Sequence, residues 1–120
     1  MDKSVRICVL ADDLIWASRL VAAVERAGAT SLAASSAAAF ERSLAGASAA
    51  LVDLNGRTYD GVEAIRLAAA ASVPVLAVGQ HEDVALRRRA LAAGARRVFS
   101  YNKMFSDGPA VVAGLVEVQR

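Results

Sequence analysis

Short, uninterrupted apolar runs alternate with longer amphipathic segments along this chain, and this alternation restricts the fold more than any other feature. The apolar runs are typical of strands that are buried on both faces, and the segments between them have the apolar spacing of helices. We therefore expect strands over residues 7–11, 30–34, 49–52, 73–78 and 97–101, and helices over residues 14–27, 36–44, 61–71, 82–93 and 107–118. Strands that alternate with helices predict a parallel sheet covered by helices on both faces.

Glycine and proline residues mark the ends of these segments. Gly28 and Gly94 follow two of the expected helices, and Pro109 falls in the first turn of the last one. Five strand–helix units in 120 residues suit one domain over residues 1–120. The natural arrangement is the flavodoxin-like α/β fold, a three-layer sandwich around a five-stranded parallel sheet with the strand order 2-1-3-4-5.

Charge and cysteine content exclude several classes of protein. The 14 basic and 12 acidic residues nearly balance, so the formal net charge of +2 does not by itself indicate a nucleic-acid-binding protein. The one cysteine, Cys8, lies in an apolar run and fits a reducing compartment. No signal peptide is visible, and no stretch approaches the ~18 apolar residues of a membrane span. We expect a cytoplasmic protein without a membrane partner.

Three carboxylates follow two strands that are neighbours in the expected sheet. Asp12 and Asp13 come after the first strand, and Asp53 comes after the third. Because the strands are parallel and adjacent, these side chains should converge, and Mg²⁺ would relieve their mutual repulsion. Asn55 could add a carbonyl oxygen from the following loop. An aspartate after a strand is also a common helix cap, and for Asp13 this reading is at least as good.

The run Asp53-Leu54-Asn55 followed by Asp60-Gly61, together with the acidic residues after the first strand, resembles the receiver domain of two-component response regulators. The resemblance covers essentially the whole chain. It implies that Asp53 accepts a phosphoryl group from a histidine kinase. It also implies that Asp12, Asp53 and the carbonyl of Asn55 hold Mg²⁺, with Asp13 as a further candidate ligand because Ala11 stands at the family's first acidic position.

Other positions depart from the family pattern. In receiver domains, a Ser or Thr after the fourth strand and a Lys after the fifth bind the phosphoryl oxygens, and an aromatic residue completes the switch. Here these three positions fall on Gly79, Tyr101 and Val98. Lys103 lies two residues late and could replace the family Lys only across a bulge. The pocket should therefore compensate a phosphoryl group poorly, which predicts weak, atypical phosphorylation or none.

A basic cluster on the fourth helix suggests a contact surface. Arg87, Arg88 and Arg89 are consecutive, so they cannot all share one helical face, and a solvated surface is the plainer reading. The resemblance implies a partner or homodimer surface on the fourth helix, fifth strand and last helix, including Arg87, Arg88 and Val98.

Together these features predict a regulatory signalling domain, not an enzyme, that acts through protein–protein contacts with a histidine kinase or another signalling protein. Two alternatives remain open. One is a phosphorylation-independent sensor of a small ligand, for which Gly79 would leave space in the crevice. The other is a nucleic-acid adaptor that uses the arginine cluster, or a transcription regulator in which this domain is part of a longer chain.

Overall fold

Continuous apolar runs form five strands, and the amphipathic segments between them form five helices. The structure, a computed structural model, describes residues 5–118 of the 120-residue chain. None of the helices in this described part is long and apolar enough to cross a bilayer. The elements are β1 (Arg6–Leu10), α1 (Leu14–Arg26), β2 (Thr30–Ala34), α2 (Ala37–Leu44), β3 (Ala49–Asp53), α3 (Gly61–Ala70), β4 (Val75–Gly79), α4 (Val84–Ala93), β5 (Arg97–Ser100) and α5 (Tyr101–Val118).

The strands form one parallel sheet in the order β2-β1-β3-β4-β5, which confirms the fold predicted from the sequence. The register places Asp53 at the end of β3 beside Val78 of β4, and Gly79 beside Ser100 of β5. All strands run in the same direction, so their carboxyl ends meet at one edge of the sheet. The loops that follow β1, β3 and β4 therefore lie close to the start of α5.

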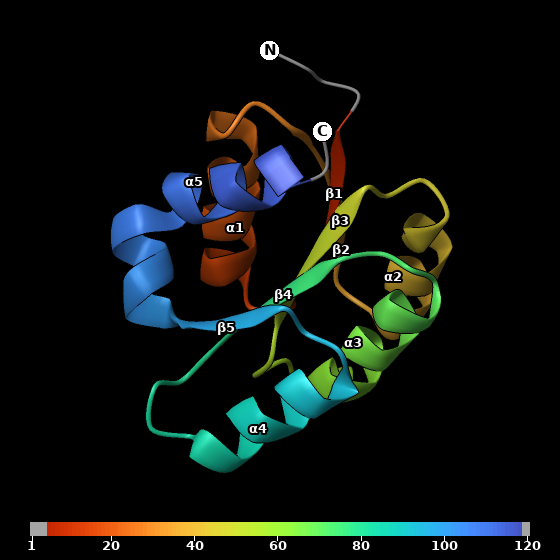
Figure 1. Ribbon diagram of the computed structural model, residues 1–120, viewed down its shortest axis with the longest axis vertical. Helices are drawn as coiled ribbons and strands as arrows, with labels where there is room; N and C mark the ends of the chain where they lie inside the picture. Colours follow the sequence, from red (N-terminus) through yellow and green to blue (C-terminus); the bar gives the residue numbers. More distant parts are fainter. Residues whose placement is uncertain (1–4, 119–120) are drawn as a thin grey trace.

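Helices cover both faces of the sheet. Figure 1 shows α1 and α5 on one side of the strands and α2, α3 and α4 on the other. Side chains alternate in direction along a strand, so Ile7 of β1 packs toward α1 and α5, whereas Cys8 packs toward the other three helices. The fully buried Phe40 and Leu20 anchor α2 and α1 to these two faces. Burial of both faces produces the apolar runs seen in the sequence.

Short polar side chains fix where the helices begin. A side-chain oxygen just before each of the first four helices accepts a hydrogen bond from a backbone amide three residues later, which satisfies a donor that the helix itself leaves unpaired. The capping residues are Asp13, Ser36, Asp60 and Asp83. The β-to-α connections are therefore defined by local hydrogen bonds.

The last helix begins earlier than the sequence predicts. We expected β5 to end at Tyr101 and the helix to begin near Asp107, but the strand ends at Ser100 and the helix follows at once. Ser100 Oγ accepts a hydrogen bond from the backbone N–H of Lys103 at 3.0 Å, as a helix cap does. The helix is kinked at Asp107, where φ is −131° and ψ is 23°, because Pro109 cannot donate a backbone hydrogen bond to the preceding turn.

Candidate functional site

A cavity of about 860 Å³ opens at the carboxyl ends of the strands. The loops after β1 and β3 and the first residue of α5 form its walls. Four of the predicted metal or phosphoacceptor residues and Tyr101 share it. Its lining residues are Asp12, Asp13, Leu14, Ile15, Trp16, Asp53, Asn55, Arg57, Thr58, Gln80 and Tyr101.

Asp53 is the buried acid of this cavity, and only 2% of its surface is exposed. One carboxylate oxygen, Oδ1, accepts a hydrogen bond from the backbone N–H of Asn55 at 3.1 Å and a short one from the hydroxyl of Tyr101. Burial raises the pKa of Asp53, and the negative charges of Asp13 and Asp12 add to this effect. The two hydrogen bonds act in the opposite direction without cancelling it.

Tyr101 reaches Asp53 because α5 begins directly at the end of β5. Its hydroxyl also lies 3.0 Å from Oδ1 of Asn55, so two acceptors compete for one proton. Burial raises the pKa of Tyr101, and the hydrogen bond and charge of Asp53 raise it further. Tyr101 is therefore a neutral donor toward Asp53, whereas a lysine at this position would bring a positive charge.

Asp12 holds the loop after β3. Its Oδ2 accepts hydrogen bonds from the backbone N–H groups of Arg57 and Thr58, both at 2.8 Å, and from the hydroxyl of Thr58 at 2.9 Å. Desolvation alone would raise the pKa of Asp12, but the hydrogen bonds from Thr58 and Arg57 together lower it. Asp12 thus connects the β1 end of the sheet to a segment more than forty residues later.

Asp13 caps α1. Its Oδ1 accepts a hydrogen bond from the backbone N–H of Trp16 at 2.9 Å, so the helix-cap reading of this residue is confirmed. The neighbouring aspartates therefore have different roles: Asp12 organises a distant loop, and Asp13 begins the next helix.

The predicted magnesium ligands share the cavity, and the magnesium site itself stays a prediction. Asp12, Asp13 and Asp53 each use one carboxylate oxygen for the hydrogen bonds described above, and Asn55 Oδ1 faces the hydroxyl of Tyr101. Within residues 5–118, no three Asp, Glu, His or Cys side chains gather closely enough to hold a metal ion together. The mutual approach that the sequence predicted for these carboxylates thus stops short of a shared coordination site.

Comparisons with known proteins place this geometry on a known fold. No protein-family model and no curated protein matches the chain. The receiver domain of the TMAO respiratory system response regulator TorR superposes with a TM-score of 0.83 at 19% identity, covering 97% of this chain and 99% of that one. A CheY-like response regulator receiver domain protein from Methanospirillum hungatei JF-1 gives a TM-score of 0.81 at 18% identity, with 96% and 95% covered. The chain has the receiver fold.

A third similar structure is that of a phosphorylated protein. It is a response regulator from Burkholderia pseudomallei with a phosphorylated aspartic acid, a calcium ion and citrate, with a TM-score of 0.74 at 16% identity. The superposed residues cover 96% of this chain and 72% of the Burkholderia protein. The resemblance stated from the sequence is therefore confirmed at the level of the fold.

The positions at which the sequence departs from the receiver pattern have the following surroundings. Gly79 ends β4, and a Cβ added there would lie 3.2 Å from the end of the Leu54 side chain. Val98 packs among buried residues on the α2–α4 face of the sheet. The Nζ of Lys103 pairs with Oδ2 of Asp107 at 2.8 Å on the exposed surface of α5.

Sequence reasoning missed two residues of the loop after β3. Thr58 supplies the amide and hydroxyl that hold Asp12, and Tyr59 donates a hydrogen bond to the backbone carbonyl of Asp53 at 2.7 Å. The ring of Tyr59 lies where a side chain at Gly56 would be, so Gly56 lets the loop fold closely onto it. Only the small residue at position 56 was a signal in the sequence, because the partners are distant along the chain.

Proposed function

We propose that this chain is a signal-transduction receiver domain of a response regulator with an atypical phosphorylation switch. Asp53 is the phosphoacceptor, and the output is a protein–protein contact with a histidine kinase or another signalling protein of the cytoplasm. The fold supports this proposal, as does the position of Asp53 at the end of β3 on the wall of an open cavity.

The switch is atypical because the hydroxyl of Tyr101 donates a hydrogen bond to Asp53 from the position after β5 where receiver domains have a lysine. A phosphoryl group would add nearly two negative charges beside Asp12 and Asp13. A neutral hydroxyl compensates this charge less than an ammonium group does. Gly79 adds no hydroxyl from β4, so we expect wild-type Asp53 to accept a phosphoryl group slowly and incompletely.

Intact-mass spectrometry after incubation with a small-molecule phosphodonor in Mg²⁺ buffer tests this proposal. The wild-type chain should gain little mass, whereas Tyr101→Lys, alone or with Gly79→Ser, should increase the phosphorylated fraction several-fold. The gain should disappear when Asp53→Asn is added. Asn102→Lys is the matched control, because it adds the same charge at an exposed neighbouring position.

Two results would contradict the proposal. Complete phosphorylation of the wild-type chain at Asp53, with no further gain in Tyr101→Lys, would show an ordinary receiver site. A gain in Asn102→Lys as large as that in Tyr101→Lys would show that added charge, not its position beside Asp53, is what limits the reaction.

The cavity itself favours the alternative of a small-ligand sensor. Its walls combine carboxylates with the apolar side chains of Leu14, Ile15 and Trp16, a lining suited to an organic cation. Such a ligand would raise the melting temperature of the wild-type chain without any phosphodonor. A thermal-shift series with small amines and guanidinium compounds distinguishes the two functions, because a phosphoswitch gains no stability from these cations.

A further inference from the structure

A row of side chains connects buried Asp53 to the protein surface. Tyr101, hydrogen-bonded to Asp53, packs against Trp16 with ring centroids 4.6 Å apart and an interplanar angle of 40°. The guanidinium of Arg19 lies 5.1 Å from the centroid of the Trp16 ring and 4.6 Å from that of Phe105. Phe105 is 65% exposed, so the row begins at the bottom of the cavity and ends at solvent.

Trp16, Arg19 and Phe105 form what we call the α1–α5 patch. Trp16 and Arg19 lie on the first turns of α1, and Phe105 lies on the first part of α5. Arg19 of α1 lies over the ring of Phe105 of α5, so the patch joins the two helices. The two helices also approach closely at Gly108, where a Cβ would lie 3.2 Å from that of Ala23.

The other side of the sheet offers no comparable path. Gly79 has no side chain to follow a change at Asp53, and Val98 is an aliphatic residue packed into the core on the α2–α4 face. The Tyr101 hydroxyl, by contrast, donates directly to the carboxylate of Asp53, so it feels a change in the charge or occupancy of that group.

Tyr101 has two acceptors within reach, which gives it two positions. Its hydroxyl is hydrogen-bonded to Oδ1 of Asp53 and lies 3.0 Å from Oδ1 of Asn55. Any group that takes Oδ1 of Asp53 removes the first acceptor and leaves the second. The ring that carries this hydroxyl is in contact with Trp16, so a change in the hold of Asp53 on Tyr101 acts directly on that contact.

We propose that Tyr101 transmits the state of Asp53 to the α1–α5 patch, so that the regulated surface of this domain lies on α1 and α5. The proposal rests on the assignment of Asp53 as the sensing residue. It does not require phosphorylation, because loss of the negative charge of Asp53 by itself weakens the hydrogen bond that Tyr101 donates to it. The chain has one tryptophan, Trp16, so its emission reports on the surroundings of that ring, which include the contact with Tyr101.

A double-mutant cycle tests this route in the folded, full-length chain. Asp53→Asn is the input, and the outputs are Trp16 fluorescence and the NMR shifts of the Trp16 indole N–H and the Phe105 amide. We expect Asp53→Asn to change all three signals in the wild-type chain. In a Tyr101→Phe background, which keeps the ring and removes the hydroxyl, the change should fall to less than half.

Tyr59→Phe is the matched control. It also removes a tyrosine hydroxyl close to the cavity, but that hydroxyl donates to the backbone carbonyl of Asp53 and not to its carboxylate. The response of the patch to Asp53→Asn should persist in this background. Arg19→Gln breaks the row farther along: the signal should still reach Trp16 but no longer Phe105.

Equal responses with and without the Tyr101 hydroxyl would overturn the proposal, as would Asp53→Asn shifts that are largest at the amides of α4 and β5. Circular dichroism and melting curves establish that each variant is folded. If Tyr101→Phe fails to fold, Arg19→Gln still decides the second half of the row. Because no phosphodonor is present, the relay can fail or succeed independently of the mass-spectrometric test of the proposed function.

Discussion

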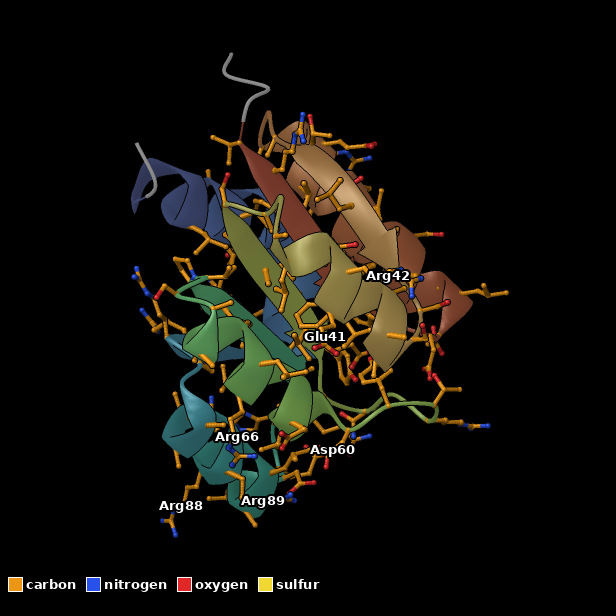
Figure 2. All side chains as sticks on the ribbon, turned by 90° about the vertical axis from the view of Figure 1, so that its right-hand side faces the viewer. Glu41, Arg42, Asp60, Arg66, Arg88 and Arg89 are labelled. Carbon is orange, nitrogen blue, oxygen red and sulfur yellow. The ribbon has the colours of Figure 1, made fainter. Side chains whose placement is uncertain are left out.

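The α1–α5 side and the α4 side of this molecule differ in how they connect to Asp53. On the first side, a hydrogen bond and a row of ring contacts lead from the cavity to Phe105 at the surface. On the second side, Arg88 and Arg89 extend from α4 into solvent, as Figure 2 shows, and Val84 and Leu91 are each about half exposed. The predicted contact surface, on α4, β5 and α5, therefore overlaps the α1–α5 side only at α5.

If the proposed relay holds, this difference means that a substitution in such a fold can redirect coupling as well as remove it. Compared with the lysine that the receiver resemblance implies at this position, Tyr101 brings no charge to Asp53 but adds a ring that contacts Trp16. Compared with the aromatic residue that the resemblance implies at position 98, Val98 brings no ring to the opposite side of the sheet. Coupling requires an element with two arrangements, and Tyr101 with its two acceptors is the candidate here.

The largest difference between the two sides should appear in the free energy of unfolding when Tyr101 on one side and Val98 on the other are each replaced by alanine. Tyr101→Ala removes a half-buried ring, its contact with Trp16 and the donor to Asp53. We expect it to lower the free energy of unfolding by about 2–3 kcal/mol, against about 1 kcal/mol for Val98→Ala. Urea denaturation followed by circular dichroism measures both, and equal losses would show that Tyr101 is not the better-anchored residue.

The adjacent aspartates allow a sharper comparison inside the cavity. Asp12→Ala should expose the amides of Arg57 and Thr58 to hydrogen exchange and leave that of Trp16 protected, and Asp13→Ala should do the reverse. Each effect should be roughly five- to tenfold in the exchange rate, the factor that corresponds to the ~1 kcal/mol of a typical helix cap. Simultaneous exposure of all three amides in either variant would mean that the loop and the helix open as one unit.

The fold was predictable because burial on two faces leaves a simple mark on the sequence. Strands covered by helices on both sides must be apolar throughout, so the runs near Val9, Leu51 and Val78 showed the strands and, by their number and spacing, the sheet. Local signals were also readable, since Asp13 lies three residues before the amide that it caps. The phosphoacceptor role of Asp53 remains a prediction.

The details of the site were less predictable because they depend on where one strand ends and on distant partners. Ser100 acts as a cap and ends β5 one residue before Tyr101, which turns that side chain toward Asp53 and leaves Lys103 to pair with Asp107. Nothing local to Asp12 indicated that Thr58 would be its partner. Nor did the sequence show that both neighbouring aspartates would accept hydrogen bonds from backbone amides; the magnesium site stays a prediction.

The stability of the Asp53→Asn and Asp12→Asn variants should depend on pH in opposite ways. Burial raises the pKa of Asp53, so between the unfolded value of about 3.9 and the folded pKa the folded state binds more protons, and this residue lowers stability as pH rises. Asp53→Asn should therefore be more stable than the wild-type chain at pH 7, on the order of 1 kcal/mol, with the difference closing below about pH 4. Denaturation at a series of pH values measures this difference.

Asp12→Asn is the opposite case and serves as the control. Hydrogen bonds lower the pKa of Asp12, so its contribution is present above the unfolded pKa of about 3.9 and is lost as pH falls through the folded value. The Asn variant should be less stable than the wild-type chain at pH 7 and should approach it in acid. A loss of stability at pH 7 in Asp53→Asn would instead mean that the charged carboxylate stabilises the fold, and that Tyr101 holds it more strongly than burial opposes it.

The smallest effects should come from the surface arginines, and they give the finest test of the comparison. Arg88 is exposed on α4, so Arg88→Ala should change the free energy of unfolding by less than about 0.5 kcal/mol. Arg19 lies over two rings, so Arg19→Ala should cost about 1 kcal/mol, of which part depends on Phe105. A Phe105→Ala background should reduce the cost of Arg19→Ala and leave that of Arg88→Ala unchanged. If the two arginines behave alike, the contacts of Arg19 with the rings contribute nothing measurable, and the α1–α5 patch is as loosely held as the surface of α4.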